Sequence, residues 1–342
     1  MPLITIVSPC YNEEDNVAEC HATIVRIFEE QLPGYDRQHV FVDNASSDRT
    51  LEILREIAAK DPAVGVVANA RNFGVFRSTF NGLRYAKGDA ILVMLPVDLQ
   101  DPPELIPDFV KLWEQGYEVV AGARSNREES FTLRSARKIF YRIVNKLSDF
   151  EISPDVGEFS LIDRKVLDAV LMHDDRYPYI RGIIASVGFK RIIVPYLWKA
   201  RKRGVSKHNL FQMTDQALNA IFAFTRAPMR FCTFAGFAIA ALSFFAALIS
   251  VVVWAINPEL APRGTTTIIV SLFMLAGIQL VFIGMLGEYV TSIQSQVRGG
   301  PLVVERERIN LDASESAPDP RVDARSEQSL RQETSPQPQR AG

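Results

Sequence analysis

The amino-acid sequence predicts an α/β domain with a mostly parallel, Rossmann-like sheet, followed by a C-terminal hairpin of two transmembrane helices. Two observations support this prediction. Between residues 3 and 121, short apolar runs alternate with amphipathic stretches, which is the pattern of parallel strands joined by helical crossovers. Residues 231–256 and 265–287 contain no charged side chain across 26 and 23 positions, and each run exceeds the roughly 20 residues that cross a bilayer core.

The expected strands and helices follow one another along the chain. Five apolar runs predict strands: residues 3–7, 40–42, 64–67, 90–95 and 119–121. The stretches around them predict helices: residues 13–31, 49–59, 76–86 and 103–115. Because the strands are apolar throughout rather than alternating, helices are expected on both faces of the sheet.

Composition and charge bear on the class of function. The 342 residues carry a formal net charge of −2, which gives no support for nucleic-acid binding. Cys10, Cys20 and Cys232 lack the spacing of a metal site, and their odd number argues against a disulfide framework. The N-terminus has a strand pattern and predicts no signal peptide, so the main domain is expected in a reducing cytoplasm.

The two charge-free runs predict a hairpin, because only residues 257–264 separate them. Basic residues flank the pair: Arg201, Lys202, Arg203, Lys207, Arg226 and Arg230 before it, and Arg298 after it. The positive-inside rule then places the main domain and both termini in the cytoplasm, at the inner membrane. Residues 208–225 show apolar positions at helical spacing, which fits a helix on the membrane surface and a helix packed on the sheet equally well.

These features divide the chain into seven segments. They are an α/β domain at 1–205, an amphipathic juxtamembrane helix at 206–227, transmembrane helices at 228–256 and 265–293 around an external loop at 257–264, a cytoplasmic segment returning to the domain at 294–306, and a tail at 307–342. The tail is rich in Ser, Pro, Gln, Asp and Arg with few apolar residues, and it is expected to be disordered.

Polar motifs follow the strand ends, where open α/β sheets bind their ligands. The most informative is Asp-Leu-Gln-Asp-Pro-Pro-Glu at residues 98–104, after the fourth strand. Asp98 and Gln100 offer hard oxygen ligands that suit Mg²⁺ or Mn²⁺ beside a diphosphate. Asp101 is expected to cap the helix that begins at Pro103. Further polar motifs follow the first three strands, at residues 9–14, 43–50 and 72–74.

In this order and spacing, the motifs resemble the family 2 glycosyltransferases, which have the GT-A nucleotide-sugar fold. More narrowly, they resemble the polyprenyl-phosphate glycosyltransferases, a group that includes dolichol-phosphate mannose synthases and bacterial undecaprenyl-phosphate glucosyltransferases. The resemblance covers residues 3 to about 304 and includes Gly-Ala-Arg at 122–124, Glu-Phe-Ser-Leu-Ile-Asp-Arg at 158–164, Arg-Lys-Arg-Gly-Val-Ser-Lys at 201–207 and Gly-Glu-Tyr at 287–289. The Gln-x-x-Arg-Trp motif of processive polysaccharide synthases is absent, which disfavours a polymerase.

The resemblance implies roles for individual residues. Those expected to bind the nucleotide-sugar are Pro9, Tyr11, Glu13, Asp43, Asp98 and Gln100, the last two through the metal ion. Those expected to bind the acceptor phosphate are Arg124, Arg134, Ser135, Arg201, Arg203 and Lys207. Asp98, Arg124 and Arg201 are expected to act in catalysis. Asp43 looks like the carboxylate that contacts the base, and a carboxylate suits uracil or guanine because both present a ring N–H.

The implied reaction is an inverting transfer of a sugar from a nucleotide-sugar, a UDP-sugar or GDP-mannose, to a polyprenyl phosphate at the cytoplasmic membrane face. The second pKa of a phosphate lies near 6, so the acceptor is already an anion and needs no strong base. Two alternatives stay open: a catalytically weakened homologue that serves as a membrane scaffold in glycan export, and transfer to another membrane lipid such as a diacylglycerol. The family includes tetramers, which leaves a homo-oligomer open.

Three motifs depart from the family pattern. Pro96 stands where the first Asp of the metal motif is usual, so the site would hold its metal with one motif carboxylate and bind it weakly without the donor. Asn44 replaces the second Asp of Asp-Asp-Gly-Ser. Glu158 replaces the Asp of Asp-Phe-Arg-Leu, and it is expected either to position sugar hydroxyls or to be the buried partner of an arginine.

Overall fold

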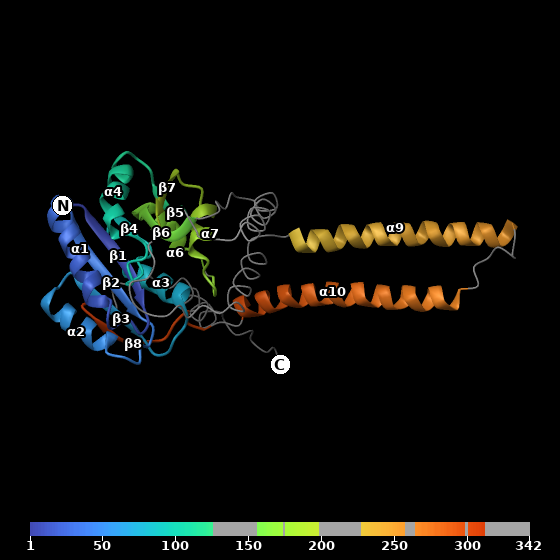
Figure 1. The fold of residues 1–342 in the computed structure, drawn as a ribbon, viewed down its shortest axis with the longest axis horizontal. Helices are drawn as coiled ribbons and strands as arrows, with labels where there is room; N and C mark the ends of the chain where they lie inside the picture. The colour runs from blue at the N-terminus through green and yellow to red at the C-terminus, as the bar shows by residue number, and fades with distance from the viewer. Residues whose placement is uncertain (126–155, 174, 198–226, 257–263, 298–299, 312–342) are drawn as a thin grey trace, which may run out of the picture. The chain divides into compact units, whose positions relative to one another are not determined.

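The computed structural model describes residues 1–125, 156–173, 175–197, 227–256, 264–297 and 300–311 (Figure 1). The chain divides into two compact units. The first comprises Met1–Ala136, Ser153–Lys207 and Gly300–Gly342, and the second comprises Arg137–Ile152 and His208–Gly299. Each unit is described by itself below.

The first unit is built on a sheet whose strand order, in the described part of the chain, is β7-β5-β6-β4-β1-β2-β3-β8. The strands are β1 Leu3–Cys10, β2 Asp36–Asp43, β3 Val64–Asn69, β4 Ala90–Leu92, β5 Val119–Ser125, β6 Val156–Asp163, β7 Arg191–Leu197 and β8 Glu305–Ile309. The pairs β1–β2, β1–β4, β2–β3 and β5–β7 are parallel, whereas β6 and β8 run antiparallel to their neighbours. The predicted mostly parallel α/β sheet is therefore confirmed.

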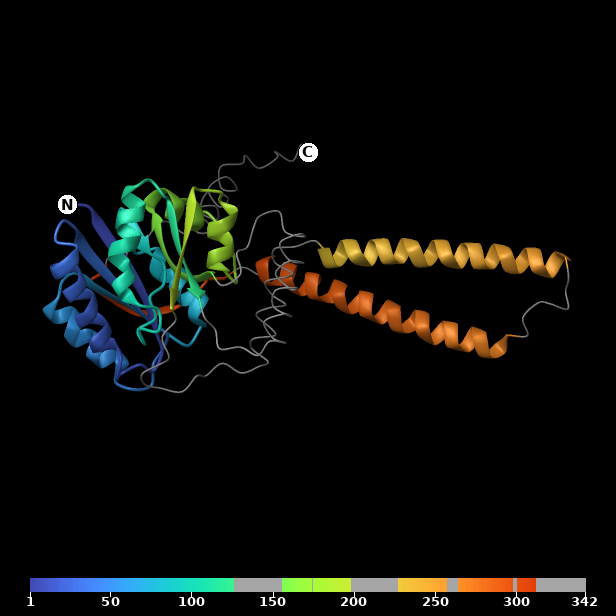
Figure 2. The same ribbon diagram turned by 45° about the horizontal axis from the view of Figure 1, so that its top comes forward.

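Helices cover both faces of this sheet, as predicted (Figures 1 and 2). Their bounds are α1 Val17–Gln31, α2 Thr50–Lys60, α3 Val75–Leu83, a 3₁₀ turn at Pro103–Leu105, α4 Ile106–Glu114, α6 Arg164–Leu171 and α7 Ile180–Ser186. Buried residues of α1, α2 and α4 share one core with Phe41 and Phe159 of the sheet. Buried residues of α3, α6 and α7 share the other core with Val40 and Ile91.

Several boundaries differ from the predicted ones. The first helix begins at Val17 rather than at residue 13, because the chain before it forms a turn whose amides bond to the loop after β2. The fourth strand ends at Leu92 rather than at residue 95, and β5 extends to Ser125. The sequence patterns did not predict β6, β7, α6 or α7.

β8 lies beyond the apolar runs and adds an antiparallel edge strand beside β3. Leu311 is buried, and it covers Gly65 so closely that a Cβ there would lie 2.5 Å from Leu311 Cδ2. The tail expected from residue 307 is therefore wrong for residues 307–311, and residues 312–342 lie outside the described part. The apolar-run criterion did not predict this strand, whose sequence is Glu-Arg-Glu-Arg-Ile. An edge strand carries charges at positions where a central strand carries apolar residues.

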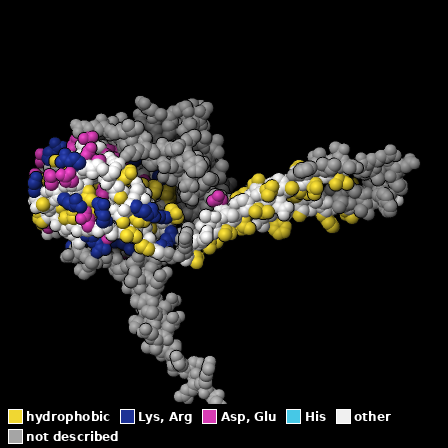
Figure 3. All heavy atoms as spheres, turned by 90° about the horizontal axis from the view of Figure 1, so that it is seen from below, with side chains coloured by type: hydrophobic (Ala, Val, Ile, Leu, Met, Phe, Trp, Pro, Cys, Tyr) yellow, Lys and Arg dark blue, Asp and Glu magenta, His cyan; other side chains and the backbone are white. Residues whose placement is uncertain are grey.

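The second unit contains two long helices, α9 Ala227–Ile256 and α10 Thr265–Val297, which touch through Cys232 Sγ and Met285 Sδ at 3.5 Å. Within the described residues, one window, Met274–Thr291, is long and apolar enough to cross a membrane, and none of it is buried inside the protein. Figure 3 shows hydrophobic side chains along the described surface of these helices. The expected juxtamembrane helix at 206–227 lies outside the described residues except for its last position.

Candidate active site

Three parallel strands end at one edge of the sheet of the first unit. The register pairs Cys10 of β1 with Asp43 of β2, and Asp43 with Ala68 of β3. β4 pairs in parallel with β1 on its other side, so the loop after β4 leaves from the same edge. The predicted convergence of the strand-end motifs thus follows from the strand register.

The loops after β1 and β2 are joined by hydrogen bonds between backbone amides and side chains. The Asn12 amide donates to Ser46 Oγ at 2.9 Å, and the Glu13 amide donates to Thr50 Oγ1 at 2.8 Å. In return, the Ser47 amide donates to Asn12 Oδ1 at 2.8 Å. Asn12 has a φ of 54°, which asparagine tolerates better than most residues. These bonds fix the first loop against the second.

Asn44 joins the second loop to the third. Its Nδ2 donates to Asn72 Oδ1 at 2.8 Å, while its Oδ1 accepts from the Phe73 amide at 2.9 Å and from Asn69 Nδ2 at 3.2 Å. An aspartate at position 44 could not donate to Asn72. The departure from the family's Asp-Asp pattern therefore has a structural use, since a single amide side chain donates and accepts between two loops.

Asp43 is fully buried at the end of β2. Its carboxylate accepts from the Ser46 amide at 3.2 and 3.3 Å. Burial raises the pKa of Asp43, although the Ser46 hydrogen bonds and the positive charge of Arg306, from β8, oppose the rise. The position offers a sheltered acceptor at the edge where a ligand would lie.

Asp98 and Gln100 lie on a tight turn after β4. The Leu99 amide donates to the Pro96 carbonyl at 3.1 Å, Leu99 has a φ of 54°, and the Gln100 amide donates to Asp98 Oδ1 at 3.2 Å. Across the described residues there is no group of three or more His, Cys, Asp or Glu side chains that could hold a metal. If Asp98 and Gln100 hold a hard divalent cation, as the resemblance implies, the remaining oxygen ligands would have to come from a bound diphosphate or water.

Asp101 does not cap the helix, contrary to the prediction. Pro102 occupies the cap position of the 3₁₀ turn, where no side chain makes a capping hydrogen bond. The Asp101 carboxylate is instead fully buried and binds Arg124 through two bonds, Oδ1 to Nε at 3.2 Å and Oδ2 to Nη2 at 3.0 Å. The Tyr196 hydroxyl donates to Asp101 Oδ1 at 2.5 Å. A bidentate arginine is worth more to a buried carboxylate than a helix cap.

Arg124 and Tyr196 both hold their protons more tightly than usual. Burial works against the charge of Arg124, but the attraction and hydrogen bonds of Asp101 outweigh it and raise the pKa of Arg124. Burial, followed by the negative charge of Asp101, raises the pKa of Tyr196. At neutral pH the guanidinium is therefore charged and the tyrosine hydroxyl is available to donate.

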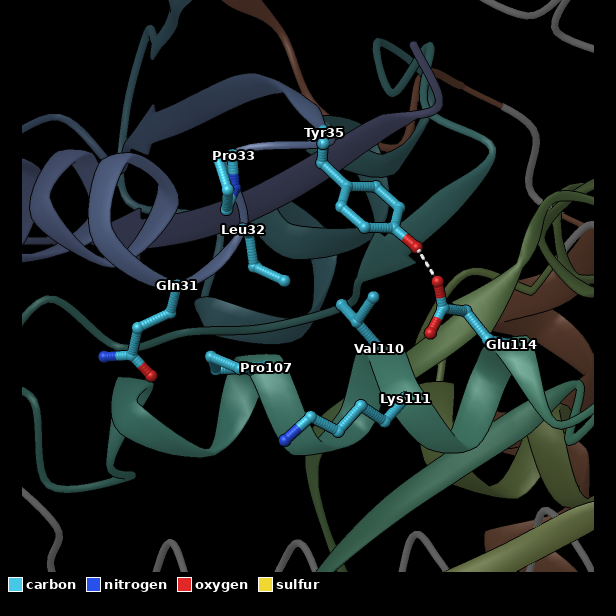
Figure 4. Close-up of a pocket in the computed structure, with 9 residues that line it drawn as sticks. Gln31, Leu32, Pro33, Tyr35, Pro107, Val110, Lys111 and Glu114 are labelled. Carbon is cyan, nitrogen blue, oxygen red and sulfur yellow. Dashed lines mark hydrogen bonds between the residues drawn. The ribbon is translucent and has the colours of Figure 1, made fainter.

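A hollow of about 430 Å³ lies elsewhere in the first unit, between the end of α1 and α4 (Figure 4). Its lining includes Leu32, Pro107 and Val110, and Tyr35 donates a hydrogen bond to Glu114 at its side. Tyr35, which lines the hollow, directly precedes the amino end of β2, so the hollow lies at the opposite edge of the sheet from Asp43. It contains none of the residues predicted for the site.

Residues 5–171 of the chain match the family described as Glycosyl transferase family 2. The chain is 35% identical over 302 residues to the SfII prophage-derived bactoprenol glucosyl transferase of Shigella flexneri, a match that covers 87% of this chain and 96% of that protein. The chain belongs to glycosyltransferase family 2. It is also 36% identical over 302 residues to the prophage bactoprenol glucosyl transferase homolog of Escherichia coli K12, covering 86% of this chain and 96% of the relative.

Two further proteins are similar to the chain. The chain is 33% identical over 309 residues to the uncharacterized glycosyltransferase YkcC of Bacillus subtilis, covering 90% of this chain and 94% of that protein. A solved structure of the mannosyltransferase PcManGT from Pyrobaculum calidifontis, in complex with GDP-Man and Mn²⁺, matches 87% of this chain and 88% of that chain at 18% identity and a TM-score of 0.45.

In this family 2 glycosyltransferase, Glu158 pairs with an arginine, as one of the two interpretations predicted. Its Oε1 lies 3.5 Å from Arg181 Nε. Arg181 also donates to the Val156 carbonyl at 2.8 Å and to the Tyr179 hydroxyl at 2.5 Å. Sequence reasoning missed Arg181 and Tyr196, which stand in no motif. Tyr196 reaches Arg124 through the pairing of β5 with β7, and Arg181 reaches Glu158 of β6 from helix α7.

The remaining predicted site residues of the glycosyltransferase divide into two groups. Pro9 is buried near the end of β1, and Tyr11 is exposed just after it. Glu13 accepts from Asn16 Nδ2 at 2.5 Å in the turn before α1. Five of the predicted acceptor-side residues lie outside the described part of the chain: Arg134, Ser135, Arg201, Arg203 and Lys207.

Proposed function

We propose that this glycosyltransferase moves a sugar, with inversion, from a nucleotide-sugar to a polyprenyl phosphate and releases a nucleoside diphosphate. The observation that carries the proposal is the length of the likeness to bactoprenol glucosyl transferases. The 302 aligned residues exceed the 226 that precede α9, so the alignment must include part of the C-terminal helices as well as the domain. A soluble acceptor would not require that shared apolar region.

The donor side of the site supports a UDP-sugar, with GDP-mannose as the alternative. Asp43 is a buried acceptor that would take the ring N–H of uracil or guanine, and it is neighboured by Pro9 of β1 and by Tyr11 and Glu13 of the loop after β1. Asp98 and Gln100 would hold Mg²⁺ or Mn²⁺, which when bound offsets the negative charge of the diphosphate leaving group. Every one of these groups lies at the edge where the three parallel strands end.

The acceptor side needs positive charge more than a base. A lipid phosphate is already an anion at neutral pH, and its oxygen would attack the anomeric carbon as the bond to the diphosphate breaks. Arg124, with its raised pKa, stays charged throughout. We assign the same task, offsetting repulsion between two anions, to Arg134, Arg201, Arg203 and Lys207. Ser135 would donate a hydrogen bond to the acceptor phosphate.

The proposed location is the cytoplasmic face of the inner membrane. In this proposal α9 and α10 span the bilayer as a hairpin, the helix expected at 206–227 lies at the interface, and the domain and both termini face the cytoplasm. The apolar window Met274–Thr291 supports one span. The excess of Lys and Arg before α9 supports the orientation.

The test is a transfer assay with membranes that contain the enzyme, labelled UDP- and GDP-sugars, and added undecaprenyl phosphate. We expect one donor to give a lipid-linked monosaccharide, and Asp98→Asn to reduce it at least about a hundredfold. Asp108→Asn, an exposed acid on α4, is the matched control and should leave the rate unchanged. No product with any donor would overturn the proposal in favour of a scaffold role, and product only with diacylglycerol would change the acceptor.

A further inference from the structure

Asp101, Arg124 and Tyr196 form a closed triangle of hydrogen bonds. Besides the two Asp101–Arg124 bonds and the Tyr196–Asp101 bond, Arg124 Nε lies 3.2 Å from the Tyr196 hydroxyl oxygen and donates to it. The triangle joins the loop that carries Asp98 and Gln100 to two strands, β5 and β7, that follow it much later in the chain. Asp101 follows Gln100 directly in the chain. Its ion pair therefore links Arg124 to the loop that is expected to bind the metal and the diphosphate.

The backbone fixes the position of the tyrosine in this triangle. Tyr196 is the Cα partner of Arg124 in the parallel β5–β7 ladder, which brings the hydroxyl to the guanidinium. Its ring packs over Gly122, where a Cβ would lie 2.8 Å from Tyr196 Cε1, and its centroid lies 5.7 Å from that of Phe159. A Cβ at Gly157 would lie 3.9 Å from Arg124 Nε. The ring therefore has little freedom to turn its hydroxyl away.

Exposure differs sharply between the two charged members. The Asp101 side chain is 1% exposed, whereas the Arg124 side chain is 23% exposed. Asp101 is therefore enclosed by protein, whereas Arg124, bonded to Asp101 through Nε and Nη2, keeps part of its side chain exposed to solvent. A guanidinium whose plane is already fixed loses little entropy when an anion binds to it.

We propose that Asp101 and Tyr196 are positioning residues, which hold the Arg124 guanidinium so that it meets a phosphate group of the reaction. This inference rests on the proposed function, because it assigns the phosphate to the donor diphosphate or the lipid phosphate of that reaction. The triangle fixes the plane of the guanidinium as well as its charge.

The first test removes only the hydroxyl. Tyr196→Phe keeps the ring against Phe159 and Gly122, and we expect about a tenfold loss of kcat/KM, the effect of one hydrogen bond to a charged network. Tyr35→Phe is the matched control, because Tyr35 is half-buried and also donates to a carboxylate, Glu114, at the opposite edge of the sheet from Asp43. It should keep kcat and KM within twofold of the wild type.

The second test uses chemical rescue of an Arg124 variant. If Tyr196 had only a structural role, removing its hydroxyl would not change the concentration of the rescuing cation that is needed. Arg124→Gly should lose at least about a hundredfold in rate, and methylguanidinium at tens of millimolar should restore part of it by entering the vacated position. In Arg124→Gly/Tyr196→Phe, about tenfold more methylguanidinium should be needed for the same rescue. Equal rescue curves for the single and double variants would overturn the proposal. If the glycine variant does not fold, Arg124→Lys takes its place. Lysine keeps the positive charge but lacks the planar guanidinium, so the rate should fall as it does in Arg124→Gly.

The source of the phosphate follows from which constant changes. A higher KM for undecaprenyl phosphate in Tyr196→Phe assigns Arg124 to the acceptor, whereas a higher Kd for UDP with Mn²⁺ assigns it to the donor. A wild-type enzyme that forms no lipid-linked sugar refutes the proposed function alone. The positioning role is then decided by UDP binding to the purified full-length proteins, and equal Kd values for the wild type and Tyr196→Phe would refute it too.

Discussion

The two halves of the candidate site are held together by different chemistry. Around β1, β2 and β3, uncharged donors make the hydrogen bonds that join the loops, and a single side chain such as Asn44 donates and accepts at once. Around β5, β6 and β7, ion pairs hold neighbouring elements together. Arg124 pairs with Asp101, and Arg181 pairs with Glu158. The neutral half would surround a base and ribose, and the charged half would meet phosphates. In each half, the groups that hold the loops in place are thus of the same kind as the groups that the proposed ligand would need.

The largest expected effect comes from removing charge in the charged half. Asp101→Asn leaves Arg124 without its buried partner and should lower the free energy of unfolding by about 3 kcal/mol, the lower end for a broken buried pair because Arg124 keeps some exposure. Urea unfolding in detergent measures this loss. The exposed Asp108→Asn should change the value by less than about 0.5 kcal/mol, and similar losses in both variants would contradict the comparison.

Adding charge to the neutral half should have the next largest effect. Asn44→Asp restores the usual family residue but removes the donor to Asn72 and buries a carboxylate beside an acceptor, so we expect a loss of about 2 kcal/mol. Urea unfolding gives the magnitude, and faster hydrogen exchange at the Phe73 amide locates it. Gln115→Glu, the same chemical change on an exposed residue, is the control. An Asn44→Asp protein as stable as the wild type would show that the amide network is dispensable.

Position 96 tests how the metal is held between the two halves. Pro96→Asp supplies the second motif carboxylate, and we expect donor-free Mn²⁺ to bind about tenfold more tightly than in the wild type, or about 1.4 kcal/mol. Calorimetry without nucleotide gives the affinities. Identical affinities would mean that Asp98 and Gln100 do not need the donor to complete the site.

The neutral half should also respond to acid through one buried histidine. His39 shares a 2.8 Å hydrogen bond with Ser8, and burial, assisted by the charges of His21 and Arg37 and opposed by Asp61, lowers its pKa well below the ordinary 6.5. Below pH 6.5, His39 takes up a proton in the unfolded chain but stays neutral in the folded protein. Stability should therefore fall as pH drops, by about 1 kcal/mol between pH 6.5 and 5.5.

The variant that checks this dependence is His39→Gln, measured by urea unfolding at several pH values. It should remove that part of the slope, while His173→Gln, a histidine on the other face of the sheet, is the matched control. Parallel pH profiles for the wild type and His39→Gln would place the acid sensitivity elsewhere.

The smallest expected effect concerns Glu158 in the charged half. Glu158→Asp restores the family residue but is one methylene too short to keep the 3.5 Å contact with Arg181, which is itself partly exposed. We expect a loss of about 0.5 kcal/mol, because partly exposed pairs contribute little. Urea unfolding and a donor-selectivity assay separate the two interpretations of this residue. A changed donor preference with unchanged stability would favour a role in positioning sugar hydroxyls.

Much of the fold could be predicted because its signals are local. Apolar runs and amphipathic stretches identified β1 to β5 and the helices between them, and parallel pairing then brought Asp43 and the Asp98 loop to one edge. The prediction for Asp101 was wrong for an instructive reason. An Asp before Pro-Pro is a good helix cap when no stronger partner exists, but Arg124 supplies a bidentate charged partner from 23 residues away.

The sequence by itself determined the α/β alternation, the position of the strand-end motifs and the two apolar runs, since each depends on residues close together in the chain. Tertiary structure alone decided the Asp101–Arg124–Tyr196 triangle, the Glu158–Arg181 pair and the return of β8 to the sheet. Tyr196 reaches Asp101 across 95 positions, and Glu307 of β8 reaches Arg55 across 252. Contacts at such separations leave no periodic pattern, because strand pairing and burial, rather than neighbouring residues, bring the groups together.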